Sequence, residues 1–290
     1  MATKGAKTKI ALNLFLLIGI FAIIYYLINQ SFADIFAELL STSFIVLVAA
    51  FLLGTIYQVA EGRSNKDIAQ PFEPTFSTCD GFWTSCYIAF YRIVSFGTGT
   101  LISEIYFYNK KGMKYSQGAG VTALHMIMYK LAVITYAIIG LIIQFSLFYS
   151  KGPNMIWFII AGIILTGVII AFLLMVSMSL NLQIFFMSIS NKLFRSERIR
   201  GWVDTCNTQI YSLRETVQTI VKDRTALLRI YFWNMVKLIF WYIMPYLFLV
   251  ENHPTIDFLL TFSFISFAVV LSGVIPTPAG IGSFEFVYLL

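Results

Sequence analysis

The sequence predicts an all-α fold: a polytopic integral membrane helical bundle with about six membrane spans, two Gly-rich broken or re-entrant segments and one cytoplasmic amphipathic helix. Two observations lead to this expectation. Of the 290 residues, 59% are hydrophobic and only 12% are charged, and the mean hydropathy is +0.81, whereas soluble domains carry about 25% charged residues. The apolar residues also form long charge-free intervals, and about 20 such residues are enough for a helix to cross the hydrocarbon core.

The same composition excludes several other classes of protein. The hydrophobic content is too high for a disordered chain, and three cysteines over the whole length do not make a disulfide scaffold. Cys79 and Cys86 lack the spacing of a zinc site, and the two histidines, His125 and His253, lie far apart in the sequence. No metal and no other cofactor is therefore expected.

The first span is predicted at residues 10–28, directly after a lysine-rich flank that should stay in the cytoplasm together with the N-terminus. A cleaved signal peptide is the alternative, because residues 31–33 resemble a cleavage site, but the apolar core exceeds the roughly 7–15 residues of a signal sequence. The second span, residues 44–60, leads into a polar, proline-interrupted segment at 61–80, which we expect to be a cytoplasmic loop.

The next apolar segment, residues 82–108, is predicted to be re-entrant. It is apolar enough to enter the bilayer, yet Lys110, Lys111 and Lys114 follow at once and again indicate the cytoplasm. Residues 97–100, Gly-Thr-Gly-Thr, supply a break in its helix. Non-helical backbone at membrane depth requires cover from protein or a water-filled cavity.

Four apolar stretches complete the set of spans. Residues 121–148 should cross outward, and a turn at 151–154 sends the chain back. The charge-free stretch that follows, up to Lys192, is interpreted as one span with a cytoplasmic continuation, because a single helix of that length would be about 60 Å long. Residues 228–250 form the next span, and a last apolar run extends from Phe258 to the end of the sequence.

We expect residues 1–290 to form a single transmembrane domain. Because the last run is still apolar at Leu290, the chain is expected to be a C-terminally truncated form of a longer protein. Residues 191–226 contain apolar residues at three- and four-residue steps beside several basic ones, which predicts a helix lying on the cytoplasmic leaflet. A regulatory or partner-binding helix is the alternative.

Five ionisable side chains are predicted to lie within membrane segments. Each costs at least about 2.5–3.5 kcal/mol on insertion scales, so such groups are functional candidates by default. The alternative is internal ion pairing that only fixes the register of the helices. The five residues are Arg92, Glu104, Lys130, Lys237 and Glu285.

The glycine-rich break at residues 97–100 and a second one at residues 276–282 resemble an internal repeat. Aligning Glu104 with Glu285 places Gly99 against Gly280, and aromatic residues follow both glutamates. Matching broken segments are a sequence indicator of a transporter binding site, because they expose backbone N–H and C=O groups at membrane depth. Such N–H groups, with Lys130 or Lys237, would bind a phosphate, while the glutamates would pair with a cationic headgroup.

The C-terminal break also carries a family resemblance. Pro276-x-Pro278-Ala279-Gly280-x-Gly282-x-x-Glu285 resembles the P-x-P-G-G-x-G-x-x-E element of the lysylphosphatidylglycerol synthase transmembrane-domain family, the flippase-like membrane half of the multiple peptide resistance factor. The earlier stretch, Gly97-x-Gly99 followed by Glu104, aromatic residues and a basic loop, is similar in layout to the first conserved region of that family. Ala279 replaces the commoner glycine, and Ser103-Glu104 departs from the usual sequence of the first region.

This resemblance implies a bacterial, multi-pass cell-membrane protein that translocates anionic or aminoacylated phospholipid of the lysyl-phosphatidylglycerol type between leaflets. A phosphatidylglycerol lysyltransferase that uses lysyl-tRNA in resistance to cationic peptide antibiotics is one alternative, and an ion or small-solute transporter is another. The family resemblance, the internal repeat and the ionisable residues within the membrane segments together suggest a set of substrate-binding residues. They are Arg92, Gly97, Gly99, Glu104, Lys130, Lys237, Pro276, Pro278, Gly280, Gly282 and Glu285.

The expected partners follow from the same reasoning. The polar intervals 61–80 and 191–226 are too short for an acyltransferase domain of about 100–200 residues, so any aminoacyltransferase would be a separate protein. The chain contains no Ser-His-Asp, H-E-x-x-H or P-loop arrangement, and no catalytic residue is assigned. Membrane phospholipid is the expected ligand, no nucleic acid is expected to bind directly, and a homo-oligomer remains open.

Overall fold

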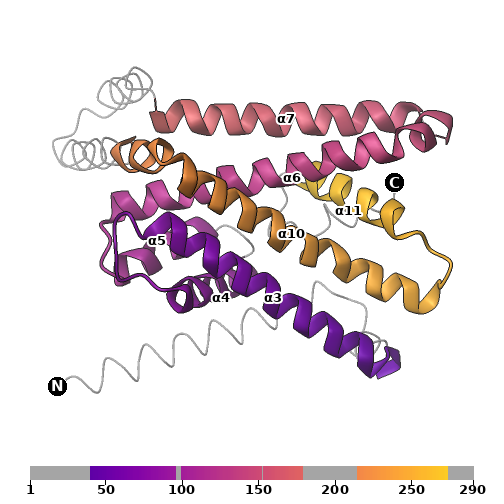
Figure 1. Cartoon of the computed structure of the whole chain (residues 1–290), viewed down its shortest axis with the longest axis horizontal. Coiled ribbons are helices and arrows are strands. Elements are labelled where there is room, and N and C mark those ends of the chain that lie inside the picture. Colours follow the sequence, from indigo (N-terminus) through magenta and orange to yellow (C-terminus); the bar gives the residue numbers. More distant parts are fainter. Residues whose placement is uncertain (1–39, 96–98, 152, 179–213, 274–290) are drawn as a thin grey trace. The chain divides into compact units, whose positions relative to one another are not determined.

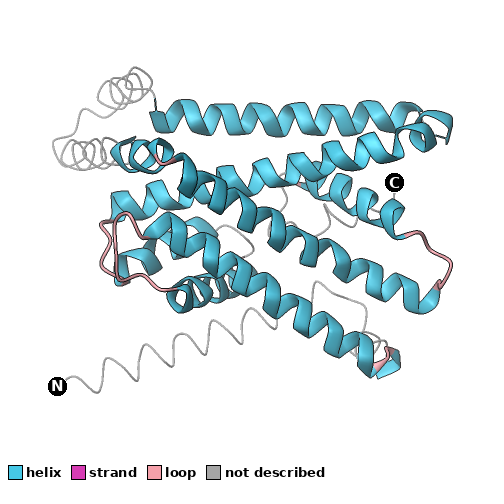
Figure 2. Cartoon of the chain, in the orientation of Figure 1, coloured by secondary structure: helices cyan, strands magenta, loops and turns pink. Residues whose placement is uncertain are grey.

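The computed structural model describes residues 40–95, 99–151, 153–178 and 214–273, and these consist of helices with no strand (Figures 1 and 2). The predicted all-α class is confirmed. Four described helices are long and apolar enough to cross a membrane. They are α3 (Phe44–Ala69), α6 (Tyr115–Lys151), α7 (Pro153–Met178) and α10 (Arg224–Asn252), and the shorter apolar helix α11 (Phe258–Ser272) follows them.

The chain divides into two units, residues 1–49 and residues 50–290. Of the first unit, the structure describes residues 40–49, which include the start of α3. All packing described below lies within the second unit. There, α6 contacts α5, α7, α10 and α11, so α6 is the helix around which the others are arranged.

Two short helices, α4 (Thr78–Val94) and α5 (Thr100–Lys110), form a hairpin. Ser77 and Asp80 form a capping box that starts α4. The Lys111 Nζ, just after α5, lies 2.5 Å from Asp80 Oδ1 at the start of α4, so both ends of the hairpin lie together. At 1.5 Å per residue the two helices are only about 25 and 16 Å long, short of a bilayer core of about 30 Å.

This hairpin has the geometry that the predicted re-entrant segment requires. Helix α4 ends at Val94 and α5 begins at Thr100, and residues 96–98 between them, which include part of the predicted break at 97–100, lie outside the described residues. The turn from α5 to α6 uses Gly112, whose φ of 103° is in the left-handed region that favours glycine. Entry of the hairpin into the bilayer itself stays a prediction.

The base of the hairpin should be sensitive to acid. Hydrogen bonds from Lys111 and Ser77 lower the pKa of Asp80 from 3.8 to about 2. Because this folded-state pKa is below the ordinary value, ionised Asp80 stabilises the hairpin above about pH 4, and that stabilisation is lost as the pH falls to about 2. We expect the difference in melting temperature between the native chain and Asp80→Asn to shrink over this range. A difference that stays constant from pH 6 to pH 2 would contradict the role of the ionised carboxylate.

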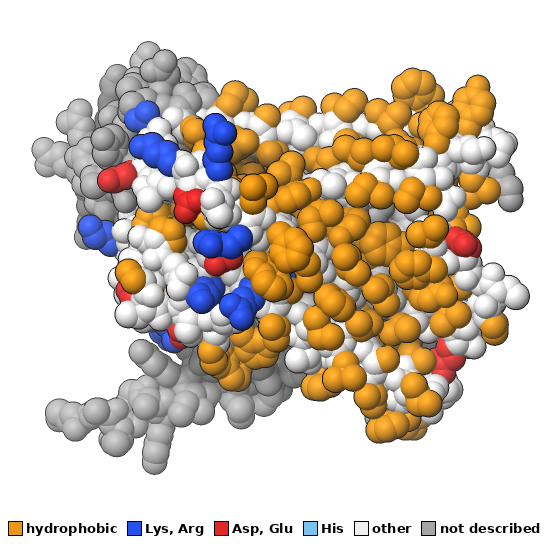
Figure 3. All heavy atoms as spheres, in the orientation of Figure 1, with side chains coloured by type: hydrophobic (Ala, Val, Ile, Leu, Met, Phe, Trp, Pro, Cys, Tyr) orange, Lys and Arg blue, Asp and Glu red, His pale blue; other side chains and the backbone are white. Residues whose placement is uncertain are grey.

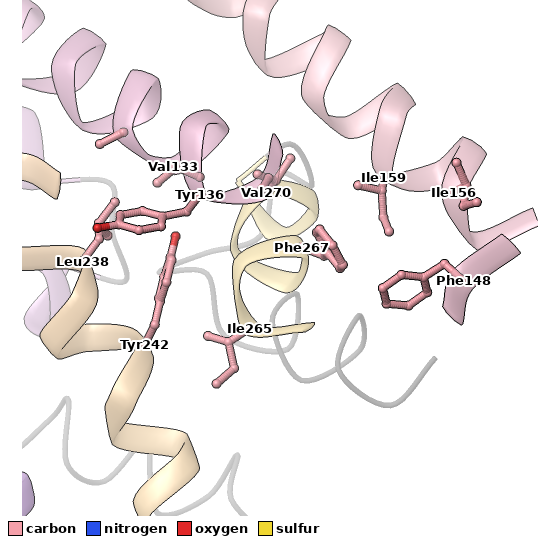
Figure 4. Close-up of a cluster of buried hydrophobic side chains, with 12 residues drawn as sticks. Val133, Tyr136, Phe148, Ile156, Ile159, Leu238, Tyr242, Ile265, Phe267 and Val270 are labelled. Carbon is pink, nitrogen blue, oxygen red and sulfur yellow. The ribbon is translucent and has the colours of Figure 1, made fainter. Parts of the chain in front are cut away.

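Aromatic contacts hold α6, α10 and α11 together. The rings of Tyr136, Tyr242 and Phe262 meet edge to face, with centroids 5.2–5.5 Å apart. Figure 4 shows Tyr136 extending from α6 toward Leu238 on α10, and Tyr242 extending from α10 toward the Tyr136 side chain. The Tyr136 hydroxyl also donates to the Met235 carbonyl at 2.9 Å, so this core fixes α10 against α6.

The surface divides into an apolar region and a basic end. Hydrophobic side chains cover much of the face shown in Figure 3, while Lys and Arg gather at the end where α3 finishes and α6 and α10 begin. Glu251 and Asp257 lie at the opposite end, around the turn from α10 to α11. By the positive-inside rule, the basic end is expected to face the cytoplasm. Its residues are Arg63, Lys66, Lys110, Lys111, Lys114, Lys222, Arg224 and Arg229.

One predicted boundary is wrong. Residues 61–69 were expected to belong to a cytoplasmic loop, but α3 continues through them to Ala69. The reason is that their polar side chains include Glu61, Ser64 and Asn65, which are buried inside the protein and do not mark an exit into water.

The other predicted spans within the described residues coincide with helices. The predicted segments 121–148 and 228–250 lie inside α6 and α10, and the turn at 151–154 falls where α6 ends and α7 begins. Of the predicted amphipathic helix, residues 214–222 are described and are helical, while 191–213 lie outside the described residues. The first span and residues 274–290 also lie outside them, so the total of about six spans stays a prediction.

Candidate functional site

One face of α3 carries polar side chains into the protein interior. Gln58, Glu61 and Asn65 follow one another at three- and four-residue steps, which places them on one side of the helix. Glu61 is 7% exposed and Asn65 is fully buried. A buried carboxylate is strongly unfavourable unless it is paired. Helices α6 and α10 supply the partners of Glu61.

His125, on α6, lies between two carboxylates. Its Nε2 is 3.0 Å from Glu61 Oε1, and its Nδ1 is 3.0 Å from Glu104 Oε1. All three side chains are buried. Because Glu104 belongs to α5, His125 connects the hairpin to α3 through two hydrogen bonds.

Lys237, on α10, occupies the other side of Glu61. Its side chain is 1% exposed, and its Nζ forms an ion pair with Glu61 Oε2. The same Nζ lies 4.9 Å from the centroid of the Tyr129 ring, close enough for a cation–π interaction. One turn earlier, Asn234 Nδ2 donates to Ser64 Oγ at 2.9 Å. Lys237 and Asn234 thus hold α10 against the polar face of α3.

We call Glu61, Glu104, His125 and Lys237 the charged network. It joins α3, α5, α6 and α10, and it is electrically neutral when His125 is protonated, since two carboxylates then balance two cations. The described residues contain no group of three His, Cys, Asp or Glu side chains that could hold a metal ion. The two nitrogens of His125 face different carboxylates on opposite sides of the ring, so the three groups do not converge on one point.

Helix α4 crosses α3 in very close contact next to the network. A Cβ added at Gly62 would lie 2.6 Å from the Phe82 backbone nitrogen, and one at Gly81 would collide with the Gly62 carbonyl oxygen. Asn65 Nδ2 donates to the Gly81 carbonyl at 3.4 Å. Two glycines therefore let the hairpin approach α3 closely enough for Glu104 to reach His125.

The family model of the lysylphosphatidylglycerol synthase TM region matches residues 10–290. The chain belongs to this family. The family is defined by a transmembrane region. Because four described helices are also long enough to span a membrane, the chain is a multi-pass, lipid-related membrane protein. The resemblance inferred from the C-terminal motif and the first glycine-rich region is thereby confirmed. No curated protein and no solved structure matches the chain.

Within this member of the lysylphosphatidylglycerol synthase TM-region family, the predicted site residues are distributed over several places. Glu104 and Lys237 both belong to the charged network. Arg92 is exposed in the last turn of α4 and lies within electrostatic range of Lys237 and Tyr129. Glu104 and Lys237 are therefore brought together through His125 and Glu61, not by direct contact.

Lys130 and Gly99 have surroundings of their own. Lys130 is partly buried on α6, and its Nζ lies 3.5 Å from the Gly273 carbonyl at the end of α11. Gly99 precedes α5, and its N–H donates to Ser95 Oγ at 2.8 Å. The remaining predicted residues, Gly97, Pro276, Pro278, Gly280, Gly282 and Glu285, lie outside the described residues.

Sequence reasoning missed two members of the charged network. Glu61 was assigned to a loop because polar residues surround it, and His125 was considered only as a metal ligand. A usable signal exists for both. Glu61 shares a three- and four-residue spacing with Gln58 and Asn65, and His125 is a titratable group inside a predicted span.

Proposed function

We propose that this protein is a lipid translocator that moves anionic or aminoacylated phospholipid, of the lysyl-phosphatidylglycerol type, from one leaflet of the membrane to the other. The observation that carries the proposal is the charged network, which is buried where a short hairpin meets three helices of spanning length. Charged groups at membrane depth cost several kcal/mol and mark substrate or ion pathways. The membership of the chain in a lipid-named family supports a lipid as the substrate.

Arg92 is the group best suited to bind the phosphate. It is exposed and forms no ion pair with any described residue, whereas Lys237 is already paired with Glu61. A guanidinium binds phosphate through two parallel hydrogen bonds. The neighbouring Phe90 and Ile93 are 47% and 64% exposed. An exposed cation in the same turn of α4 as exposed apolar side chains matches a molecule that has a phosphate and acyl tails.

Lys130 is a second cation without an acidic partner among the described residues. The Lys130 side chain lies beside Gly273. In the sequence, Gly273 comes shortly before the second glycine-rich segment, residues 276–282. We propose that Lys130 and Glu285, the predicted contact from that segment, bind the headgroup on the α11 side. An aminoacylated headgroup carries a cation as well as a phosphate, so it needs a carboxylate and a basic group together.

The proposal is tested by leaflet exchange of fluorescent lipids in vesicles that contain the purified protein. We expect faster exchange of phosphatidylglycerol and lysyl-phosphatidylglycerol than in protein-free vesicles, and at least a roughly tenfold loss in Arg92→Gln, since one charge-assisted hydrogen bond is worth about 1.5–3 kcal/mol. Arg63→Gln, an exposed arginine on α3 outside the network, should keep the native rate.

Three outcomes would contradict this function. Lipid exchange no faster than in protein-free vesicles would contradict the proposal that the protein translocates lipid. Substrate-dependent currents without lipid exchange would indicate a solute transporter. Formation of lysyl-lipid from charged tRNA by the purified chain would indicate a transferase.

A further inference from the structure

The geometry of His125 determines how many protons the site must hold. A carboxylate only accepts hydrogen bonds, and each nitrogen of His125 lies 3.0 Å from a carboxylate oxygen. Each of the two contacts therefore needs one proton. The imidazolium with two carboxylates satisfies both, and so does a neutral imidazole with one protonated carboxyl group. In either form Glu61, His125 and Glu104 together hold two protons.

Loss of one of these protons would disrupt the site in a defined way. One nitrogen would then face a carboxylate oxygen at 3.0 Å with no hydrogen between them, acceptor against acceptor. The charged network would also change from neutral to a net charge of −1 in the protein interior, where unbalanced charge is costly. The least costly response is for one carboxylate to move away from His125.

Glu104 is the carboxylate that would move. Glu61 is held a second time by Lys237, whereas Glu104 has His125 as its only hydrogen-bond partner among the described residues. Glu104 lies on α5, the second arm of the short hairpin. Release of the proton would therefore break the hydrogen bond that ties the hairpin to His125 on α6, while the ion pair between Glu61 and Lys237 still joins α3 to α10.

The other titratable groups around the three residues are either paired or uncharged at neutral pH, apart from Arg92. From α3, α5 and α6 they are the hydroxyls of Tyr57, Tyr108 and Tyr129, and α10 contributes Lys237 and Tyr242. Arg92 on α4 is the remaining cation within electrostatic range. An anionic headgroup bound at Arg92 would cancel this positive charge. It would thereby change the relative stability of the protonated and deprotonated forms of Glu61, His125 and Glu104.

We infer that Glu61, His125 and Glu104 form a proton-binding site, and that the binding and release of its proton drives the α4–α5 hairpin through the lipid transport cycle. The inference rests on the proposed function and adds its energy source. In each cycle the site takes a proton from the water on one side of the membrane and releases it to the water on the other. Lipid movement is thereby linked to the proton gradient.

The decisive experiment is lipid exchange by the full chain in vesicles with an imposed pH difference between the inside and the outside. We expect the gradient to change the rate of phosphatidylglycerol movement in one direction by at least about threefold, and to move protons in step with lipid, as read by a pH dye trapped in the vesicles. Glu104→Gln should abolish the effect of the gradient. Glu215→Gln, an exposed carboxylate in the helical residues 214–222, should retain it.

A spectroscopic measurement tests the site independently of transport. Because the chain has two histidines, His253→Gln leaves a single histidine signal in the NMR spectrum of the ¹⁵N-labelled protein in nanodiscs. His253 caps α10 at the exposed turn and is not part of the network. We expect the NMR signal of His125 to report a change of protonation state at the pH at which the lipid exchange rate changes. In Glu104→Gln, the pH of the His125 transition and the pH of the rate change should shift together.

The outcomes separate this inference from the proposed function. Native lipid exchange that ignores both the pH and the gradient would overturn proton coupling and leave translocation intact. A His125 signal that does not change over the pH range in which exchange changes would overturn the assignment of the site. Absence of any lipid exchange would overturn the proposed function and the coupling with it.

Discussion

Replacing Lys237 by methionine is expected to lower the free energy of unfolding by about 3–5 kcal/mol. The substitution keeps the volume of the side chain but removes the cation that pairs with Glu61, a carboxylate that is 7% exposed. What remains is two buried carboxylates, Glu61 and Glu104, with His125 as the one cation of the network. Unfolding of the purified protein in mixed micelles of increasing SDS content measures the loss.

A matched control exists on the same helix. Arg229 pairs with Asp67 at 3.7 Å, but the arginine side chain is 57% exposed. Exposed pairs contribute about 0–1 kcal/mol, so Arg229→Met should have a small effect. The double variant Glu61→Gln/Lys237→Met should be less destabilised than the sum of its single variants, because the two groups are in contact. Equal losses for Lys237→Met and Arg229→Met would show that burial of the network contributes nothing.

Gly81→Ala is expected to have the second large effect, a destabilisation of about 3 kcal/mol, at the upper end of the range for overpacked sites. A Cβ at Gly81 would collide with the carbonyl oxygen of Gly62, and a backbone oxygen cannot rotate away as a side chain can. The hairpin would have to separate from α3. That separation would break the bonds from Asn65 to the Gly81 carbonyl and from Ser85 to Gln58.

Gly167→Ala is the control for this substitution. Gly167 lies within α7, and an added Cβ there has no heavy atom within 4 Å. Alanine is a better helix former than glycine by about 1 kcal/mol, so this variant should match or exceed the native stability. Thermal unfolding followed by circular dichroism compares the two. Similar melting temperatures for the two variants would contradict a tight crossing of α3 and α4.

The long helices are predictable from the sequence because lipid imposes a simple rule. A helix that faces hydrocarbon must be predominantly apolar over about 20 residues, so the long apolar intervals locate α6, α7 and α10 even though Lys130 and Lys237 lie within two of them. The hairpin is predictable for a similar reason, since Lys110 and Lys111 require its end to return to water while Gly97 and Gly99 permit a break. Helix ends that point into protein follow no such rule.

The failure at Glu61 illustrates this limit. Hydropathy distinguishes lipid from water, but the surroundings of Glu61 are neither, because the side chain faces His125 and Lys237 inside the protein. Pairing between residues 61, 104, 125 and 237 is a property of tertiary structure, and single-sequence patterns do not contain it. The sequence indicates that Glu104 and Lys237 are functional candidates; only the fold reveals that His125 and Glu61 connect them.

The most direct measurement of the central claim is the rate of phosphatidylglycerol exchange for Glu104→Gln beside the native protein and Glu215→Gln. Under the proposed function the charged network is the working site, so Glu104→Gln should lose at least about tenfold in rate, or about 1.4 kcal/mol in activation free energy, while remaining folded. Glu215→Gln should exchange lipid at the native rate. An unchanged rate in Glu104→Gln would contradict the assignment of this network as the site of translocation.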